Sequence, residues 1–116
     1  MTANIIKNAL LVLSLWAVVP GLNAVELGEQ IETIMAQPVD EEYAAYLAEG
    51  CTSCHQSEQN KGTPVIEGMG KRHIVISLLL YKNGSRVNAA MTSITSGLGD
   101  EEIAALAEYF SQVDSQ

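Results

Sequence analysis

Apolar positions repeat every three to four residues near the start and the middle of the chain, which is the spacing of an amphipathic helix. In the first such stretch the repeated residues are Leu27, Ile31, Ile34 and Met35. The second stretch begins at Asp40, a residue type that caps helices, and continues to Glu49. Gly50 follows at once, and glycine is the commonest residue just past a helix end. The pattern therefore predicts two helices, the second over residues 40–49.

The second half of the chain shows the same periodicity twice more. From Lys71 to Lys82 it brings Ile74, Leu78 and Tyr81 to one side, and Asn83-Gly84 follows as a stop signal. The last stretch opens at residues 99–102 with acidic residues, which are favoured at a positive helix start. Its apolar stripe is Ile103, Leu106, Ala107 and Phe110. We expect an all-α fold in which the helix after Asp40 crosses the C-terminal helix.

The N-terminal residues are typical of a secretory signal peptide. Lys7 lies in a short polar start, residues 9–19 are apolar, and Pro20-Gly21 break the run. A membrane anchor is the alternative, but a span needs about 20 apolar residues and this run is shorter. We expect cleavage after Ala24 and an exported, periplasmic protein without a stable membrane span. The expected organisation is a leader over 1–24, a helical extension over 25–39 and one domain over 40–116.

Removing the leader leaves 92 residues with five basic and 14 acidic side chains, a formal charge of −9. A nucleic-acid partner is not expected for so acidic a chain. A domain of this size buries a small apolar core and often needs a covalent or metal staple. The chemistry of that staple is indicated by the two cysteines.

Cys51-Thr52-Ser53-Cys54-His55 matches the C-x-x-C-H pattern of covalent c-type haem attachment. The two thiols add to the two vinyl groups of one haem, and a two-residue spacer sets them apart along one haem edge. His55 then reaches the iron as its proximal ligand. The pattern occurs once, so we expect one haem, with iron as the metal.

Three other interpretations of the cysteines are weaker. A thioredoxin-like pair needs a βαβ context that the Ala-, Glu- and Leu-rich sequence does not show. A structural zinc site would have to use Cys51, Cys54, His55 and His73, two of which are sequence neighbours. A disulfide across two residues would close a very short loop and contribute little stability.

The second axial ligand is expected to be Met91. A methionine opposite histidine closes the iron to added ligands and raises its potential, which suits an electron carrier. Met91 lies in an expected linker between two helical patterns, where the chain can wrap the open haem face, whereas Met35 fits an apolar helix face. Met69 follows His55 too closely. His73, the remaining alternative, lies in a basic run that looks like an exposed helix start.

A ligating histidine usually donates its other ring N–H to a carbonyl, which orients the ring. Pro64 closes a loop of suitable length after His55, and its carbonyl is the expected acceptor. Apart from scattered carboxylates, the sequence near the motif offers no general base or nucleophile. We therefore expect an electron carrier and no catalytic residue.

These motifs carry a resemblance to a known family. Besides Cys51–His55 they are residues 64–68, residues 81–86, Met91 and residues 98–110. Together they resemble the class I c-type cytochromes, in which three to five helices wrap one covalently bound haem. The order is similar to small periplasmic monohaem carriers and especially to the cytochrome subunit of flavocytochrome c sulfide dehydrogenase. Two features depart from that pattern: Gln56 stands where many relatives have glycine, and residues 25–37 have no place in the minimal fold.

The resemblance implies a redox partner, for instance a flavoprotein sulfide dehydrogenase subunit that passes electrons to the haem in sulfide oxidation. It also implies that Arg86 and Tyr81 contact a haem propionate. Two alternatives remain: a stand-alone carrier to a terminal oxidase or another reductase, and a haem enzyme or sensor with an open sixth position.

Acidic and basic residues are separated along the sequence. Residues 25–50 and 100–114 contain twelve acids and no base, and residues 51–99 contain every base of the mature chain: Lys61, Lys71, Arg72, Lys82 and Arg86. From this separation we expect an acidic body and a less acidic, haem-bearing face. That face would dock on a neutral or acidic partner patch.

Overall fold

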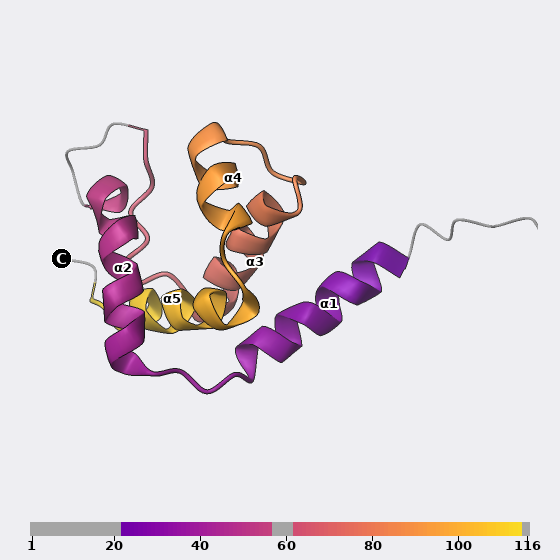
Figure 1. Ribbon diagram of the computed structural model, residues 1–116, viewed down its shortest axis with the longest axis horizontal. Coiled ribbons are helices and arrows are strands. Elements are labelled where there is room, and N and C mark those ends of the chain that lie inside the picture. Colours follow the sequence, from indigo (N-terminus) through magenta and orange to yellow (C-terminus); the bar gives the residue numbers. More distant parts are fainter. Residues whose placement is uncertain (1–21, 57–61, 115–116) are drawn as a thin grey trace, which may run out of the picture.

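The computed structural model describes residues 22–56 and 62–114, and these form five helices (Figure 1). The helices are α1 (Leu22–Met35), α2 (Glu41–His55), α3 (Lys71–Lys82), α4 (Ala89–Ser96) and α5 (Asp100–Gln112). No strand occurs among the described residues. The predicted all-α class is confirmed.

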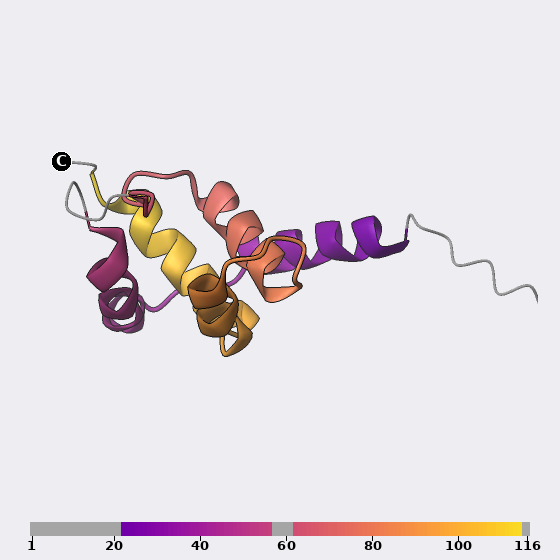
Figure 2. The same cartoon turned by 90° about the horizontal axis from the view of Figure 1, so that it is seen from above.

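The C-terminal helix α5 is the centre of the core. One side of it is fully covered, with Ile103, Ala107 and Phe110 each at most 1% exposed. It packs most extensively against α2 and next against α3, and Figure 2 shows it crossing between them. The small side chains of Ala44 and Ala48 on α2 are buried, which lets the two helix backbones approach closely. The predicted crossing of these two helices is confirmed.

Helix α1 belongs to the same core and is not a loose extension. Its Ile34 is 0% exposed and Ile31 7%, and both pack with α3 and α5. A hydrogen bond from Gln30 Nε2 to Asp100 Oδ1 at 3.0 Å also holds it to the start of α5. The predicted leader lies mostly outside the described residues, apart from residues 22–24, which form the first turn of α1. In the described part of the chain no helix is both long and apolar enough to span a membrane.

Helix α2 is longer than the sequence pattern predicts. Asp40 caps it as expected, because its Oδ1 accepts from the Tyr43 backbone N–H at 2.9 Å. However, the helix continues through Gly50 to His55, and Gln56 is the first extended residue after it. The prediction that Gly50 ends the helix is wrong, because Gly50 does not adopt the positive φ of a helix-ending glycine. The whole Cys51–His55 motif is therefore helical.

A tight connection joins α3 to α4. Helix α3 ends at Lys82, as predicted, and the Asn83 N–H bonds to the Leu79 carbonyl at 2.9 Å. Gly84 then turns the chain with φ of 79°, a conformation that glycine adopts without strain. Helix α4, which the sequence analysis did not anticipate, begins soon afterwards and lies opposite the end of α2 (Figure 1).

Candidate functional site

The last turn of α2 presents three reactive side chains on one side. Cys51, Cys54 and His55 stand at positions i, i+3 and i+4, which are neighbours on a helix surface. Cys51 is half-buried and Cys54 exposed, and no disulfide joins them. Burial raises the pKa of the Cys51 thiol, and the neighbouring Cys54 raises it further. The arrangement leaves two thiols one helical turn apart beside an imidazole.

The imidazole of His55 is held in one orientation by a backbone carbonyl. Its Nδ1 lies 2.7 Å from the Pro64 carbonyl oxygen, and because a carbonyl only accepts, Nδ1 carries the hydrogen. The other ring nitrogen, Nε2, is then the one that can ligate a metal. The hydrogen bond that the sequence analysis expects between His55 and Pro64 is present. Gly62, with φ of 101°, lies in the turn that leads to Pro64.

Met91 lies within α4 and not in a linker, which corrects the expected setting of this residue. Asn88 caps the helix by accepting from the Met91 backbone N–H at 3.1 Å. Thr95 donates its hydroxyl hydrogen to the Met91 carbonyl at 2.8 Å. The Met91 backbone is thus fixed from both sides, and its half-buried side chain packs at the edge of the core. The cap at Asn88 is the sequence signal that could have identified this helix.

The other ligand candidates lie elsewhere in the structure. Met35 packs against the core from α1, as expected for an apolar helix face. Met69 is half-buried, and its N–H bonds to the Ile66 carbonyl at 3.2 Å in a turn before α3. His73 is exposed in the first turn of α3, as the sequence analysis expects. Among the described residues no three His, Cys, Asp or Glu side chains are grouped to hold a metal ion.

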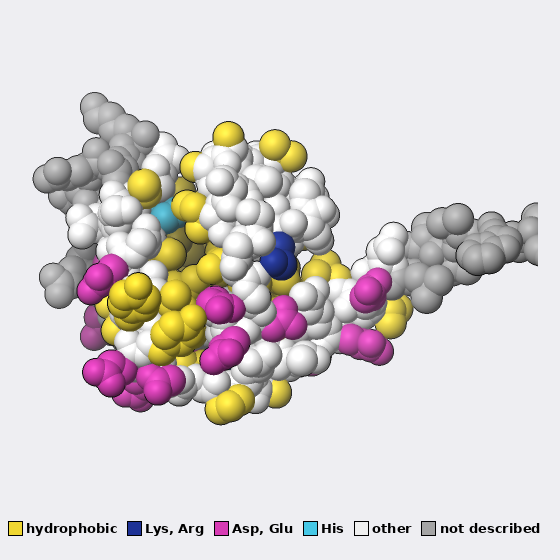
Figure 3. Space-filling model, in the orientation of Figure 1, with side chains coloured by type: hydrophobic (Ala, Val, Ile, Leu, Met, Phe, Trp, Pro, Cys, Tyr) yellow, Lys and Arg dark blue, Asp and Glu magenta, His cyan; other side chains and the backbone are white. Residues whose placement is uncertain are grey.

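The surface between the end of α2 and α4 is hollowed. Figure 3 shows apolar side chains in this hollow and a histidine side chain at its edge. One buried polar atom nearby, the Thr92 hydroxyl oxygen next to Met91, has no hydrogen-bond partner among the described residues. Two thiols and an imidazole beside an apolar hollow are the groups that attach and ligate a haem, and the Met91 thioether on α4 is the candidate for the second ligand. The residues present fit that group.

Tyr81 and Arg86 form a pair at the end of α3. The Arg86 guanidinium lies 5.3 Å from the centre of the Tyr81 ring, in the range of a cation–π contact. Arg86 also donates to the Ser77 hydroxyl at 3.4 Å. It takes part in neither of the two ion pairs that the described residues form. The contact of Tyr81 and Arg86 with a haem propionate remains a prediction.

Two of the five bases that were expected on a less acidic face are paired with acids in the described part of the chain. Lys71 pairs with Glu108 of α5, and Arg72 pairs with Glu32 of α1, each at 2.6 Å. Lys82 donates to the Leu98 carbonyl at 2.5 Å, and Lys61 lies outside the described residues. Two of the bases that are clustered in sequence are thus folded against acids from distant segments. The charges on Lys71 and Arg72 are therefore locally compensated.

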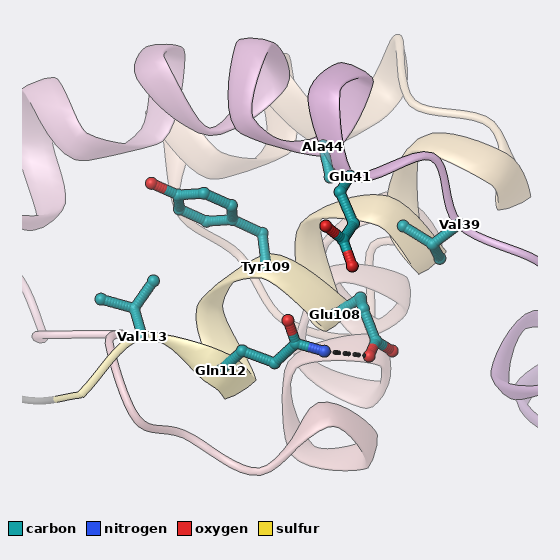
Figure 4. A pocket seen from close by; sticks show the side chains of 7 residues that line it. All are labelled: Val39, Glu41, Ala44, Glu108, Tyr109, Gln112 and Val113. Carbon is teal, nitrogen blue, oxygen red and sulfur yellow. Dashed lines mark hydrogen bonds between the residues drawn. The ribbon is translucent and has the colours of Figure 1, made fainter.

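A separate shallow pocket lies between the first turn of α2 and the last turn of α5 (Figure 4). Its lining residues are Val39, Glu41, Ala44, Glu108, Tyr109, Gln112 and Val113. Of its polar side chains, Glu108 is already engaged, because it accepts from Gln112 Nε2 at 2.5 Å and pairs with Lys71. It contains none of the residues of the Cys51–His55 motif.

Comparisons with known proteins give a consistent picture. The family model described as cytochrome c matches residues 41–114. The chain is 33% identical over 82 residues to a protein of Chlorobaculum tepidum named cytochrome subunit of sulfide dehydrogenase, covering 69% of this chain and 74% of that protein. It is also 33% identical over 67 residues to cytochrome c-553 of Helicobacter pylori, covering 54% and 70%.

Proposed function

The chain belongs to the cytochrome c family, and we propose that it is an exported electron carrier that accepts electrons from a flavoprotein sulfide dehydrogenase. Membership of the family implies a covalently bound haem c. Such a haem would supply one-electron transfer chemistry at its iron. The electron-carrier role follows from the family; the compartment, the axial ligands and the partner are the further parts of the proposal.

Each residue of the candidate site has a distinct task in this proposal. Cys51 and Cys54 hold the haem through thioether bonds. His55 is the proximal ligand through Nε2, and the Pro64 carbonyl keeps its ring in that orientation. Met91 is the second axial ligand, on a helix whose start is fixed by Asn88. Tyr81 and Arg86 are proposed to contact a propionate, which would give the guanidinium an anionic partner.

The observation that carries the proposal is the convergence of the Cys51–His55 turn with Pro64. The histidine ring is oriented by the chain itself, with Nδ1 committed to a carbonyl at 2.7 Å and Nε2 left for ligation. Such orientation by a backbone acceptor is usual for histidines that ligate metals. In this proposal Met91 would close the sixth position of the iron, which suits electron transfer, because an enzyme or sensor needs an open one.

The sulfide-linked partner is proposed from the relative whose name includes sulfide dehydrogenase. The test is purification of the haem-loaded protein from the periplasm of its native host. We expect a flavin-containing protein to accompany it, and sulfide to reduce the haem within the complex. Removal of the flavoprotein should abolish this reduction. Equal reduction by sulfide with and without the flavoprotein would contradict the proposed partner.

A second candidate function is a stand-alone carrier. The similarity to cytochrome c-553 favours it, because nothing in that name points to a permanent subunit. In this case the protein would purify as a monomer without a stoichiometric partner, and the purified reductase or oxidase would exchange electrons with it in transient encounters.

A further inference from the structure

Helix α2 leaves two tyrosines uncovered near its start. Tyr46 is 70% exposed and Tyr43 36% exposed, whereas the aromatic Phe110 is 1% exposed. Tyrosine is enriched at the centre of protein interfaces, because its rigid ring buries a large area and its hydroxyl forms hydrogen bonds. An uncovered pair on one helix is therefore a candidate contact surface.

Carboxylates surround these tyrosines. Tyr43 Oη donates to Glu102 Oε1 of α5 at 3.3 Å. Desolvation is the largest cause of a raised Tyr43 pKa, and the charges of Glu102 and Glu101 raise this pKa further. Glu42 adjoins Tyr43 on α2. None of these three glutamates takes part in either ion pair of the described residues. The name Tyr46 surface is used below for Glu42, Tyr43, Tyr46, Glu101 and Glu102.

The Tyr46 surface continues along α2 to the cysteine that is proposed to hold the haem. Tyr43, Gly50 and Cys54 lie on one side of the helix, with Tyr46 adjoining them. No atom lies within 4 Å of the position where a side chain at Gly50 would begin, and Cys54 is exposed. Eight residues of helix separate Tyr46 from Cys54, about 12 Å along the axis. Figure 3 shows apolar and acidic side chains gathered over α2 and α5, on the same face as the hollow.

We propose that the Tyr46 surface is the docking surface for a redox-partner protein that presents lysines and arginines around an apolar pocket for Tyr46. This rests on the proposed function, because the partner would exchange its electron with a haem at Cys54. Charge complementarity favours such a partner, because the three glutamates of the Tyr46 surface take part in neither ion pair of the described residues. A second copy of this chain is disfavoured, since it would place like charges against each other.

The test uses the reduced, haem-loaded protein and two inorganic oxidants. Tris(phenanthroline)cobalt(III) is a cation with flat apolar faces, and hexacyanoferrate(III) is an anion; each takes one electron from the haem. We expect oxidation by the cobalt complex to slow as ionic strength rises. Glu42→Gln with Glu101→Gln should slow it roughly threefold to tenfold and speed oxidation by hexacyanoferrate(III).

A matched pair of variants separates local from overall charge. Glu26→Gln with Glu29→Gln removes the same charge from the exposed side of α1, and we expect both oxidation rates to stay within about twofold of the unmodified protein. Tyr46→Ala should slow oxidation by the cobalt complex roughly fivefold, whereas Val25→Ala, at a residue of α1 that is 61% exposed, should not. Equal effects of the two charge pairs, or no effect of Tyr46→Ala, would overturn the proposal.

A binding measurement gives an independent result. In an NMR titration of the nitrogen-15-labelled holoprotein with decalysine, amide shifts should concentrate at residues 42–46 and 101–102. Residues 26–32 carry three acids as well, and their amide signals should shift less. Larger shifts at residues 26–32 than at residues 42–46 and 101–102 would contradict the proposal. Dimerisation through α2, detected by sedimentation, would contradict it too. Failure of the proposed function can be told apart from failure of the docking proposal. A chain without a redox-active haem shows no spectrum of reduced haem before any oxidant is added.

Discussion

The two halves of the molecule differ in how fully their apolar side chains are covered. The packed half consists of α1, α3, α5 and residues 41–48 of α2, and it contains Ile34, Val75 and Ile103, each 0% exposed. The open half consists of the end of α2, residues 62–70 and residues 85–98. There Val65 is 41% exposed, Ile94 48% and Val87 86%. The open half does not close a core with its own side chains.

Every proposed haem ligand and attachment residue lies in the open half. These residues are Cys51, Cys54, His55 and Met91, and Pro64 lies beside them. A small domain has too little apolar surface to cover two cores, so the missing cover would come from the flat apolar haem. The packed half therefore sets the geometry, and we expect the structure of the open half to depend on the haem.

The largest expected effect is the loss of the open half when the haem is not attached. Cys51→Ser with Cys54→Ser should abolish covalent attachment, and backbone amides of α4 should then exchange with solvent much faster than those of α5. Hydrogen exchange followed by mass spectrometry measures both regions in one sample. Equal loss of protection in α4 and α5 would contradict the division into two halves.

Two isoleucines test the comparison with the same substitution. Ile34→Ala should lower the free energy of unfolding by about 2–5 kcal/mol, because it leaves a cavity among α1, α3 and α5. Ile94→Ala should cost less, about 1–2 kcal/mol, because Ile94 of α4 is 48% exposed and would gain further cover only from the haem. Urea unfolding of the holoprotein, followed by circular dichroism, gives both values. If Ile34→Ala cost no more than Ile94→Ala, α1 would not belong to the packed half.

Met91 in the open half and Met35 in the packed half allow the two halves to be compared in their effect on the redox chemistry. Met91→Ala should leave the haem attached but lower its reduction potential by a sizeable part of the roughly 0.8 V range that axial ligands span. It should also let cyanide or carbon monoxide bind the iron. Met35→Ala, the control in the packed half, should change neither property. An unaltered potential in Met91→Ala would transfer the ligand role to Met69 or His73.

Gly50→Ala has the smallest expected effect. Alanine is favoured over glycine in a helix interior by about 0.5–1 kcal/mol, and a side chain at Gly50 would meet no atom within 4 Å. We therefore expect the holoprotein to become more stable by that amount in urea unfolding. A destabilised holoprotein would show that the haem or another group occupies the space beside Gly50.

The sequence was most informative where one signal dominates locally. The strong apolar stripes predicted α3 and α5, the Asp40 cap predicted the start of α2, and the position of Pro64 predicted the partner of His55 Nδ1. In each case the deciding interaction spans few residues or follows a simple helical period.

The errors arose where contacts between distant segments decide. Helix α4 is short and rich in Ala, Ser and Thr, so its apolar period is weak. Gly50 after Glu49 predicts a helix end, whereas the helix continues through it. Two ion pairs join different helices, namely Lys71 with Glu108 and Arg72 with Glu32. The order of charges along the chain does not predict these pairs.

Mass spectrometry of the exported, matured protein tests the central claim most directly. The protein is unfolded and extracted with acidified organic solvent, which removes haem that is not covalently bound. We predict the mass of the polypeptide plus one haem, with the added mass on the peptide that contains Cys51 and Cys54. The mass of the bare polypeptide would contradict covalent attachment and with it the proposed electron-transfer site.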